Sequence, residues 1–435
     1  MLQFLRFQDV GPAPQMEITF KERMNFLVGD NGLGKSFLLD AAWWALTRTW
    51  VRHPLRPHLT QYIGVPPSGR RSSPEPAIEY RYTQKSGRGI HRHVSRFDPQ
   101  AQKWPPAKGR PPMPGLVLYA QVDGGFSCWD PARNYWKGDT AEREPAYRFK
   151  PQEIWDGLPI DSPTKVCNGL ISDWSIWQLE NREPFAQLKR VLRALSPSRD
   201  EPLEPGELIN KVSMEDSRKH PCIKMQYDER VPLIHASAGI RRVVALAYLL
   251  VWAWQEYVAA CQLQGVEPAR EIIFLIDEIE AHLHPQWQRR IVPALLDVME
   301  ALTGDQDVPV QLIAATHSPL IMASAEPKFD EARDGVYHLD VQDGTVTLND
   351  VPWAKQGDAV NWLVSDAFGL RQGRSVEAER AIEAAEAWMR RDRQELPAGL
   401  RSRTEIQVEL ERVLAGHDPF WPRWIVTGSD GGSSR

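Results

Sequence analysis

The sequence predicts an α/β fold in which short buried strands alternate with helices. Three largely apolar segments have the length of a strand and end before small or polar residues, as buried central strands do; they cover residues 24–28, 271–276 and 308–315. Apolar residues recur with strong periodicity from residue 228 to about residue 370. With 435 residues, of which 42% are hydrophobic, the chain is long enough for about two or three domains.

The N-terminal part predicts strands at residues 2–7 and 16–20, followed by the buried run 24–28. That run ends in GDNGLGKS, residues 29–36, which fits the pattern GxxxxGK[ST], and a helix with an apolar face follows. A strand, a glycine-rich loop and a helix in this order form a phosphate-binding loop, because backbone N–H groups surround the phosphates and the helix dipole favours their charge. The residues predicted to bind the nucleotide are Gly29, Asn31, Gly32, Gly34, Lys35 and Ser36.

The second buried run ends in an acidic pair, Asp277 and Glu278. Beside a phosphate-binding loop, such a pair suits Mg²⁺ coordination by Asp277, together with the Ser36 hydroxyl, and leaves Glu278 to polarise the attacking water as general base. Lys35 is expected to contact the β- and γ-phosphates. The alternative is a pair of solvated carboxylates, which the apolar residues directly before them disfavour.

Polar residues also follow two other predicted strands. His317 comes after the run 308–315 and could donate a hydrogen bond to the γ-phosphate; a lone histidine is more often structural, but this one completes an ordered set. Gln121 follows the predicted strand 116–120. It could reach Mg²⁺ or the nucleophilic water, so we count it among the catalytic and metal candidates, although a polar residue often opens a turn.

A second candidate anion site lies at IHASAGIRR, residues 234–242. Ser237, Ala238 and Gly239 precede a predicted helix. Because their side chains are small, an anion can approach the free N–H groups at the helix N-terminus, where the helix dipole also favours negative charge. Arg241, or its neighbour Arg242, would add positive charge. The alternative is an ordinary cap of small residues at the start of a helix.

Residues 51–115 are rich in proline and glycine and carry twelve Lys or Arg, in a chain of net charge −5. We expect loops there, with a strand pair near 78–81 and 91–96, and then helices near 150–158 and 169–195. The basic residues predict possible contact with nucleic acid through phosphates, or equally a solvated loop or a surface for the C-terminal helices. They are Arg70, Arg71, Lys85, Arg88, Arg92, Arg96, Lys103, Lys108 and Arg110.

The C-terminal part predicts a hairpin within 337–348, turning at Asp343-Gly344, and two charged helices near 375–394 and 403–415. DPFWPRW, residues 418–424, has the composition of a protein-docking anchor but could equally pack on the chain's own core.

The four cysteines are far apart in sequence and are expected to be isolated reduced thiols. The apolar run 243–254 is expected to be a buried helix rather than a membrane span, and no signal peptide is evident. A cytoplasmic location and no membrane partner follow as expectations.

Four motifs resemble those of one family. GDNGLGKS, SAG before a helix, FLIDEIEAHLHP and ATHSP resemble the Walker A, signature, Walker B with D-loop, and switch-histidine motifs of ABC-type ATPase heads, in the family order. The RecF/SMC/OLD-like group is the most similar. The resemblance implies a P-loop NTPase head with a mixed central sheet flanked by helices and an antiparallel β subdomain. Its parts would be an ATPase lobe at 1–50 and 228–370, a large insertion at 51–227 with a Q-loop strand at 116–121, and C-terminal helices at 371–435.

The resemblance also implies a head-to-tail dimer, or a higher oligomer, that encloses ATP and Mg²⁺. The P-loop of one copy and the signature of the other, Ser237, Ala238, Gly239 and Arg241, would share each nucleotide. The signature departs from the usual Leu-Ser-Gly-Gly but keeps the serine and the second glycine. His282 and His284 are then part of a D-loop rather than a metal site, since no further ligands stand nearby.

The predicted function is therefore an ATPase that switches between open and closed dimers. The chain looks similar to the ATPase subunits of Septu-like and retron anti-phage systems, which implies a sensor or regulatory role over a separate effector such as an HNH nuclease. Sustained heptads, which an SMC-like coiled coil would need, are not evident. An acidic metal cluster of the kind found in OLD nucleases is not evident either, so no nuclease activity of its own is expected. A RecF-like DNA-repair clamp and a structural scaffold locked by ATP stay open as alternatives.

Overall fold

The chain forms two compact units, residues 1–362 and residues 363–435. We analysed a computed structural model, and each unit is described by itself. The structure describes residues 1–51, 54–56, 59–62, 76–83, 89–98, 100–101, 103–107, 115–134, 146–159, 165–227, 229–269, 271–304 and 308–429. The predicted boundary at residue 371 lies within the second unit.

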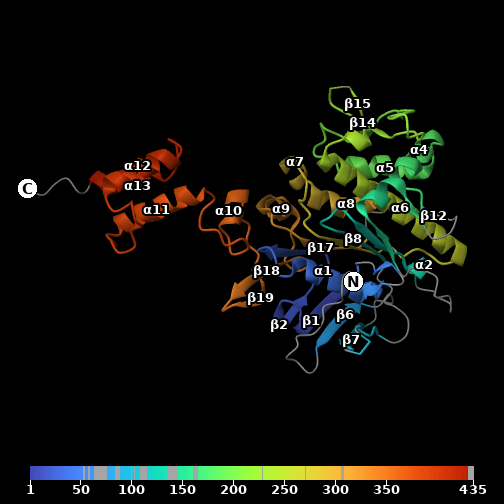
Figure 1. Ribbon diagram of the computed structural model, residues 1–435, viewed down its shortest axis with the longest axis horizontal. Helices are drawn as coiled ribbons and strands as arrows, with labels where there is room; N and C mark the ends of the chain where they lie inside the picture. Colours follow the sequence, from blue (N-terminus) through green and yellow to red (C-terminus); the bar gives the residue numbers. More distant parts are fainter. Residues whose placement is uncertain are drawn as a thin grey trace, which may run out of the picture. The chain divides into compact units, whose positions relative to one another are not determined.

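An eight-stranded mixed sheet forms the centre of the first unit, in the order β10-β9-β8-β16-β17-β3-β18-β19 (Figure 1). The five strands from β8 to β18 are parallel, while β9, β10 and β19 are antiparallel to their neighbours. This sheet confirms the predicted fold class and the three buried runs. Its strands are β3 (Met24–Gly29), β8 (Leu116–Ala120), β9 (Phe126–Trp129), β10 (Tyr147–Phe149), β16 (Ile272–Ile276), β17 (Val310–Ala315), β18 (Gly335–Gln342) and β19 (Thr345–Asp350).

A second, antiparallel sheet has the order β2-β1-β6-β7. It joins β1 (Leu2–Val10) and β2 (Ala13–Thr19) to β6 (Ala77–Thr83) and β7 (Ile90–Arg96). The expected strand pair within 51–115 is therefore present, and it extends the N-terminal sheet. The segment 51–227, expected as an insertion, thus supplies strands to both sheets.

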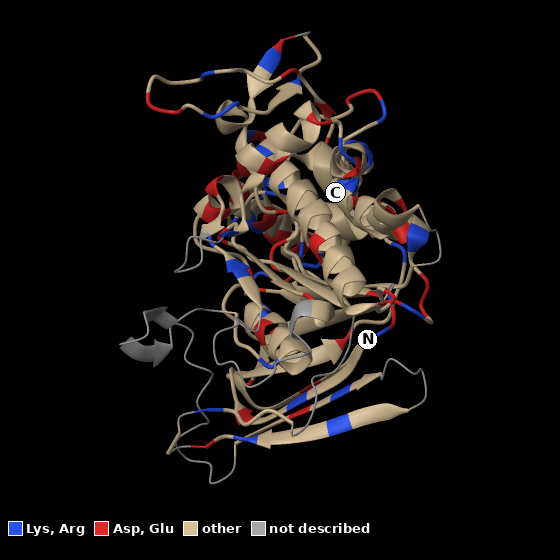
Figure 2. Cartoon of the chain, turned by 90° about the vertical axis from the view of Figure 1, so that its right-hand side faces the viewer, with Lys and Arg blue, Asp and Glu red and all other residues tan. Residues whose placement is uncertain are grey.

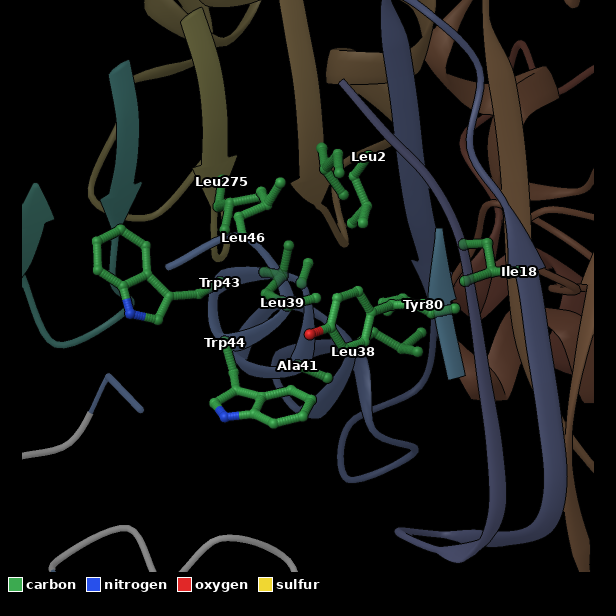
Figure 3. Packing of buried hydrophobic residues seen from close by; sticks show 14 of the residues in the cluster. Leu2, Ile18, Leu38, Leu39, Ala41, Trp43, Trp44, Leu46, Tyr80 and Leu275 are labelled. Carbon is green, nitrogen blue, oxygen red and sulfur yellow. The ribbon is translucent and has the colours of Figure 1, made fainter. Parts of the chain in front are cut away.

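Helix α1 (Lys35–Thr47) lies between the two sheets and supplies much of their shared core (Figure 3). Its fully buried side chains, including Leu39 and Trp43, pack in one cluster with Leu275 of β16 and Tyr80 of β6. Burying each such side chain contributes about 1.5–3 kcal/mol. The packing holds the end of the loop 29–36 against the central sheet.

Helices cover the other face of the central sheet. They include α6 (Ala238–Gln264), α8 (Ile291–Thr303) and α5 (Glu183–Ala194). The helix expected over 169–195 is interrupted: α4 (Leu170–Leu179) ends before Asn181, whose φ is 48°, and α5 then begins with Pro184 in its first turn. Proline cannot donate the hydrogen bond that would continue the helix, which explains the break.

Helix α6 is long and apolar enough to cross a membrane by length and composition alone. However, 67% of its most apolar window is buried inside the protein, as in the core helix of a globular domain.

The other elements of this unit are short. They are β4 (Pro54–Arg56), β5 (Leu59–Tyr62), α2 (Pro131–Asn134), α3 (Pro151–Asp156), β11 (Leu158–Pro159), β12 (Lys165–Cys167), β13 (Glu204–Pro205), β14 (Cys222–Lys224), β15 (Arg230–Pro232), η1 (Leu233–His235), α7 (Pro285–Gln288), α9 (Pro319–Ala325), η2 (Glu326–Lys328) and α10 (Ala359–Leu363).

The second unit contains the helices α11 (Val376–Met389), α12 (Arg403–Val413) and α13 (Trp421–Ser429). The first two confirm the predicted charged helices, and α13 is an addition. The aromatic residues of DPFWPRW pack inward: Phe420 is 4% exposed and Trp424 is 2% exposed in a core shared with Ile406 and Leu410. The interpretation that this segment packs on the chain's own core is therefore correct. All four cysteines are buried, and none of them forms a disulfide.

Candidate functional site

The loop 29–36 connects β3 to α1 and is closed by its own lysine. The Lys35 ammonium is buried and donates hydrogen bonds to the carbonyls of Gly29 and Asp30, each at 2.8 Å. Burial lowers the pKa of Lys35, an effect opposed by the carboxylates of Asp277 and Asp30. Asn31 and Gly32 lie exposed at the tip of the loop. The ammonium is thus held by two backbone carbonyls of a loop whose tip is open to solvent.

Two glycines of the loop are required by packing. Gly29 has φ of 127°, and a Cβ there would lie 2.2 Å from the carbonyl oxygen of Leu339 on β18. Gly34 has φ of 106°, and a Cβ there would lie 2.8 Å from the ring of Pro12. Both conformations favour glycine, so these residues shape the loop whatever it binds.

The acidic pair stands two strands away from the loop, at the end of β16. Asp277 is buried, and its backbone N–H donates to the carbonyl of Ala120 on β8 at 2.9 Å. Burial raises the pKa of the Asp277 carboxyl, and a hydrogen bond from Ser36 lowers it. The structure therefore brings together the two residues predicted to hold Mg²⁺, and their oxygens are the ligand type that Mg²⁺ prefers.

Glu278 follows in a left-handed backbone conformation, with φ of 48°. Such a conformation is costly for a residue with a side chain and is held in place here by the turn that it opens. The carbonyl of Glu278 accepts the N–H of Ala281 at 2.9 Å. The Glu278 carboxylate is close enough to Lys35 to raise the pKa of that ammonium. The predicted general base thus belongs to the same site.

His317 lies at the end of β17, between β3 and β16. The proximity of its imidazole lowers the pKa of the Asp277 carboxyl. The preceding residue, Thr316, is fully buried and donates its N–H to the carbonyl of Leu27 at 3.0 Å. Because the carboxyl ends of parallel strands meet at one edge, these side chains converge there.

Glu280 belongs to this site, although sequence reasoning placed it only within a D-loop and gave its side chain no role. Its carboxylate accepts hydrogen bonds from the Thr316 hydroxyl at 2.7 Å and from the backbone N–H of His317 at 2.6 Å. No local pattern announces this contact, because it depends on the pairing of β16 with β17.

Gln121 lies at the edge of the site, directly after β8. Its side-chain amide donates to the Ser127 hydroxyl at 3.0 Å, and its backbone N–H donates to the carbonyl of Gly125 at 2.9 Å. These bonds close the turn between β8 and β9. These contacts agree with the alternative interpretation, in which Gln121 is a polar residue that opens a turn.

The signature segment forms the start of α6. Ser237 is exposed, and its hydroxyl accepts the N–H of Ile240 at 3.4 Å, as a capping residue does. Ala238 is exposed as well. Gly239 is buried, and a Cβ there would lie 2.8 Å from the carbonyl oxygen of His282. Gly239 is therefore required by a contact within the chain, which the sequence did not indicate.

The two arginines of α6 differ in their surroundings. Arg241 is exposed and its guanidinium lies 4.9 Å from the ring centre of Trp155. Arg242 points inward and approaches the carbonyls of Val122 and Glu278 at 3.4 and 3.5 Å. Burial lowers the pKa of Arg242, and the carboxylate of Glu278 opposes this. Beside both arginines, a cavity of about 380 Å³ separates α6 from α3 and from the turn 121–125.

Three of the expected basic residues, Arg92, Arg96 and Lys103, lie in the described part of the chain. Arg92 on β7 pairs with the buried Glu79 at 2.8 Å, and this bond lowers the pKa of that carboxyl. Arg6 and Arg81 approach the same carboxylate, so charges of both signs lie side by side on this sheet (Figure 2). The expected basic residues outside the described part of the chain are Arg70, Arg71, Lys85, Arg88, Lys108 and Arg110.

Comparison with known families agrees with this geometry. A family model described as an AAA domain, putative AbiEii toxin, type IV toxin–antitoxin system, matches residues 142–323. The match contains the start of α6, the acidic pair and His317, and begins after the loop 29–36. Residues 142–323 are therefore similar to an ATPase domain of this type. The predicted resemblance to ABC-type ATPases is thereby confirmed.

Individual relatives cover different parts of the chain. The Septu protein PtuA of Bacillus thuringiensis is 30% identical over 109 residues, which are 24% of this chain and 24% of PtuA. The match therefore spans about a quarter of that relative.

Solved structures that resemble the chain include two SMC heads. The SMC head domain from Thermotoga maritima has a TM-score of 0.38 and 14% identity, over 81% of this chain and 99% of that one. The SmcHead bound to the C-winged helix domain of ScpA has a TM-score of 0.41 and 17% identity, over 80% of this chain and 98% of that one. The strand order described above carries the fold assignment.

Proposed function

We propose that the protein binds and hydrolyses ATP at the edge of the central sheet where β3, β16 and β17 end. One observation carries this proposal: Lys35, Ser36, Asp277 and His317 converge at this edge from three separate segments. Phosphate-binding N–H groups, an ammonium and metal-binding oxygens are the groups that phosphoryl transfer requires.

The residues then have distinct roles. Lys35 leaves the carbonyls of its own loop and binds the β- and γ-phosphates, together with the loop N–H groups. Glu278 takes the proton of the water whose oxygen attacks the γ-phosphorus, while the bond from that phosphorus to the bridging oxygen breaks and ADP leaves. His317 donates a hydrogen bond to the γ-phosphate. Ser36 and Asp277 would hold Mg²⁺, which when bound offsets the charge of the phosphates.

We propose further that a second copy completes the site with the start of its α6. Ser237 and Ala238 are exposed at a helix N-terminus, where free N–H groups and the dipole favour a phosphate. Arg241 lies one turn later and is also exposed. These features support a head-to-tail dimer in which each nucleotide is shared between two chains.

Substitution of Ser237 by arginine tests this arrangement. The bulky cation should obstruct the second copy, so that ATP hydrolysis is lost while a fluorescent ATP analogue still binds to the loop 29–36. Ser213→Arg, at an exposed serine in a loop, is the matched control and should hydrolyse ATP at the wild-type rate. Loss of nucleotide binding in Ser237→Arg would count against the shared site.

The Glu278→Gln variant tests the switch. Removing the general base should trap an ATP-bound dimer, which size-exclusion chromatography with light scattering would detect. If ATP only locked a scaffold, assembly and function would be unchanged by this substitution.

We also propose that the protein is the sensor or regulatory subunit of an anti-phage system and controls a separate effector, such as an HNH nuclease. The likeness to the Septu protein PtuA supports this role. Purification from the native operon, followed by mass spectrometry, should recover such a nuclease. A protein that purifies alone and whose ATPase rate rises strongly with DNA would instead be a RecF-like repair ATPase.

A further inference from the structure

The turn that follows β16, residues 278–284, contacts two different parts of the first unit. On one side, the His282 carbonyl lies against Gly239 at the start of α6, and Arg242 approaches the Glu278 carbonyl. On the other side, Glu280 reaches the end of β17. The turn thus joins the helix proposed to meet the second copy to the strand that ends at the switch histidine.

Glu280 makes the shortest of these contacts. One carboxylate oxygen accepts the Thr316 hydroxyl at 2.7 Å, and the other accepts the His317 N–H at 2.6 Å. Hydrogen bonds to a charged acceptor are about twice as strong as neutral ones. Because the two oxygens belong to one rigid group, they fix two consecutive residues at once.

The segment held by Glu280 also forms hydrogen bonds with other neighbours. Thr316 is fixed to β3 through Leu27, and its hydroxyl also accepts the N–H of Ser318 at 3.1 Å. The Ser318 hydroxyl in turn donates to Gln288 at 2.7 Å. The orientation of the backbone at His317 is therefore set by a short chain of polar contacts in which Glu280 supplies the charge.

We propose that Glu280 is a positioning residue for His317. It fixes the end of β17 so that the imidazole faces the γ-phosphate, and it touches no substrate itself. Both of its oxygens already accept protein donors, which distinguishes it from the general base Glu278. This inference rests on the proposed ATP hydrolysis and adds a residue through which a shift of α6 can reach His317.

Steady-state hydrolysis of Mg²⁺-ATP by the full chain tests the proposal. Glu280→Ala should lower kcat about 10–100-fold, as loss of an outer partner of a site residue does, with KM for ATP changed by less than about twofold. Glu280→Gln should keep most of the activity, since its amide oxygen can accept the His317 N–H and its amide N–H can meet the Thr316 hydroxyl. Glu267→Ala, at an exposed glutamate in the loop after α6, is the control.

A double-mutant cycle separates positioning from general damage. Glu280 acts through His317, so Glu280→Ala should cost nothing more once His317 is alanine. Multiplied losses in the double variant, or wild-type kcat in Glu280→Ala, would overturn the proposal. If Glu280→Ala does not fold, Thr316→Val removes one of the two bonds and should show a smaller loss of kcat, and unchanged kcat there would overturn it equally.

Different results would refute the proposed ATP hydrolysis and the proposed role of Glu280. Absence of hydrolysis in the wild type, or full activity in His317→Ala, would refute the proposed function and with it the role of Glu280. Hydrolysis that depends on His317 but is indifferent to Glu280 would refute the role of Glu280 alone.

Discussion

Replacement of Gly239 by alanine tests whether α6 and the turn 278–284 move as one. The added Cβ would lie 2.8 Å from the His282 carbonyl oxygen, whereas a carbon and a carbonyl oxygen normally approach to about 3.3–3.6 Å. The helix or the turn must therefore shift by about 0.5 Å. A misplacement of 1 Å in an active site can cost about 100-fold, so we expect kcat to fall about tenfold.

Stability should change much less than activity in this variant. Alanine in a helix is favoured over glycine by about 1 kcal/mol, which offsets part of the strain from the close contact. ATP binding to the loop 29–36 should also be unchanged, because Gly239 belongs to α6. The assay is the ATPase rate together with thermal unfolding and binding of a fluorescent ATP analogue.

Gly265 at the end of the same helix provides the control. Its φ is 64° and a Cβ there would meet no atom within 4 Å. Gly265→Ala should therefore cost about 1–2 kcal/mol of stability and leave ATP turnover at the wild-type value. Wild-type turnover in Gly239→Ala would refute the argument, as would loss of activity in both variants to the same degree.

Two further predictions concern stability. Burial raises the pKa of Asp277, so the folded state binds more protons than the unfolded state between the two pKa values, and stability falls as the pH rises through that interval. Without Mg²⁺, Asp277→Asn should have a higher Tm than the wild type at about pH 8, and the difference should vanish towards about pH 4 in calorimetry. Trp424→Ala should destabilise the second unit by about 3–5 kcal/mol. Limited proteolysis should then cut after residue 362, and an unchanged digestion pattern would contradict its place in that core.

The central fold could be predicted because its evidence is local. The segments 24–28, 271–276 and 308–315 carry apolar residues on both faces, as a strand covered on both sides requires. The contribution of 51–227 to both sheets was not predictable in the same way. Strand β6 pairs with β1, and β8 pairs with β16, across long stretches of sequence. Such pairing leaves no local mark, and the surrounding prolines and glycines favour the interpretation of loops.

The residues of the candidate site likewise divide into those that the local sequence predicts and those that depend on the whole fold. Lys35, Asp277 and His317 could be named from the sequence because each lies in the short segment after a strand whose end had to lie at one edge of the sheet. Glu280 and the inward orientation of Arg242 depend on which strands are neighbours and on how α6 crosses them. Those facts come from the whole fold.

The position of β17 explains why the site is connected in this way. Since β17 lies between β3 and β16, the residue after β17 stands between the phosphate-binding loop and the acidic pair. The turn after β16 runs beside the end of β17, where Glu280 makes its two hydrogen bonds. Further along the same turn, His282 contacts the start of α6. A ligand that displaces the start of α6 therefore acts first on the turn 278–284, which carries both Glu278 and Glu280. The proposed general base and the proposed support of His317 would respond to it together.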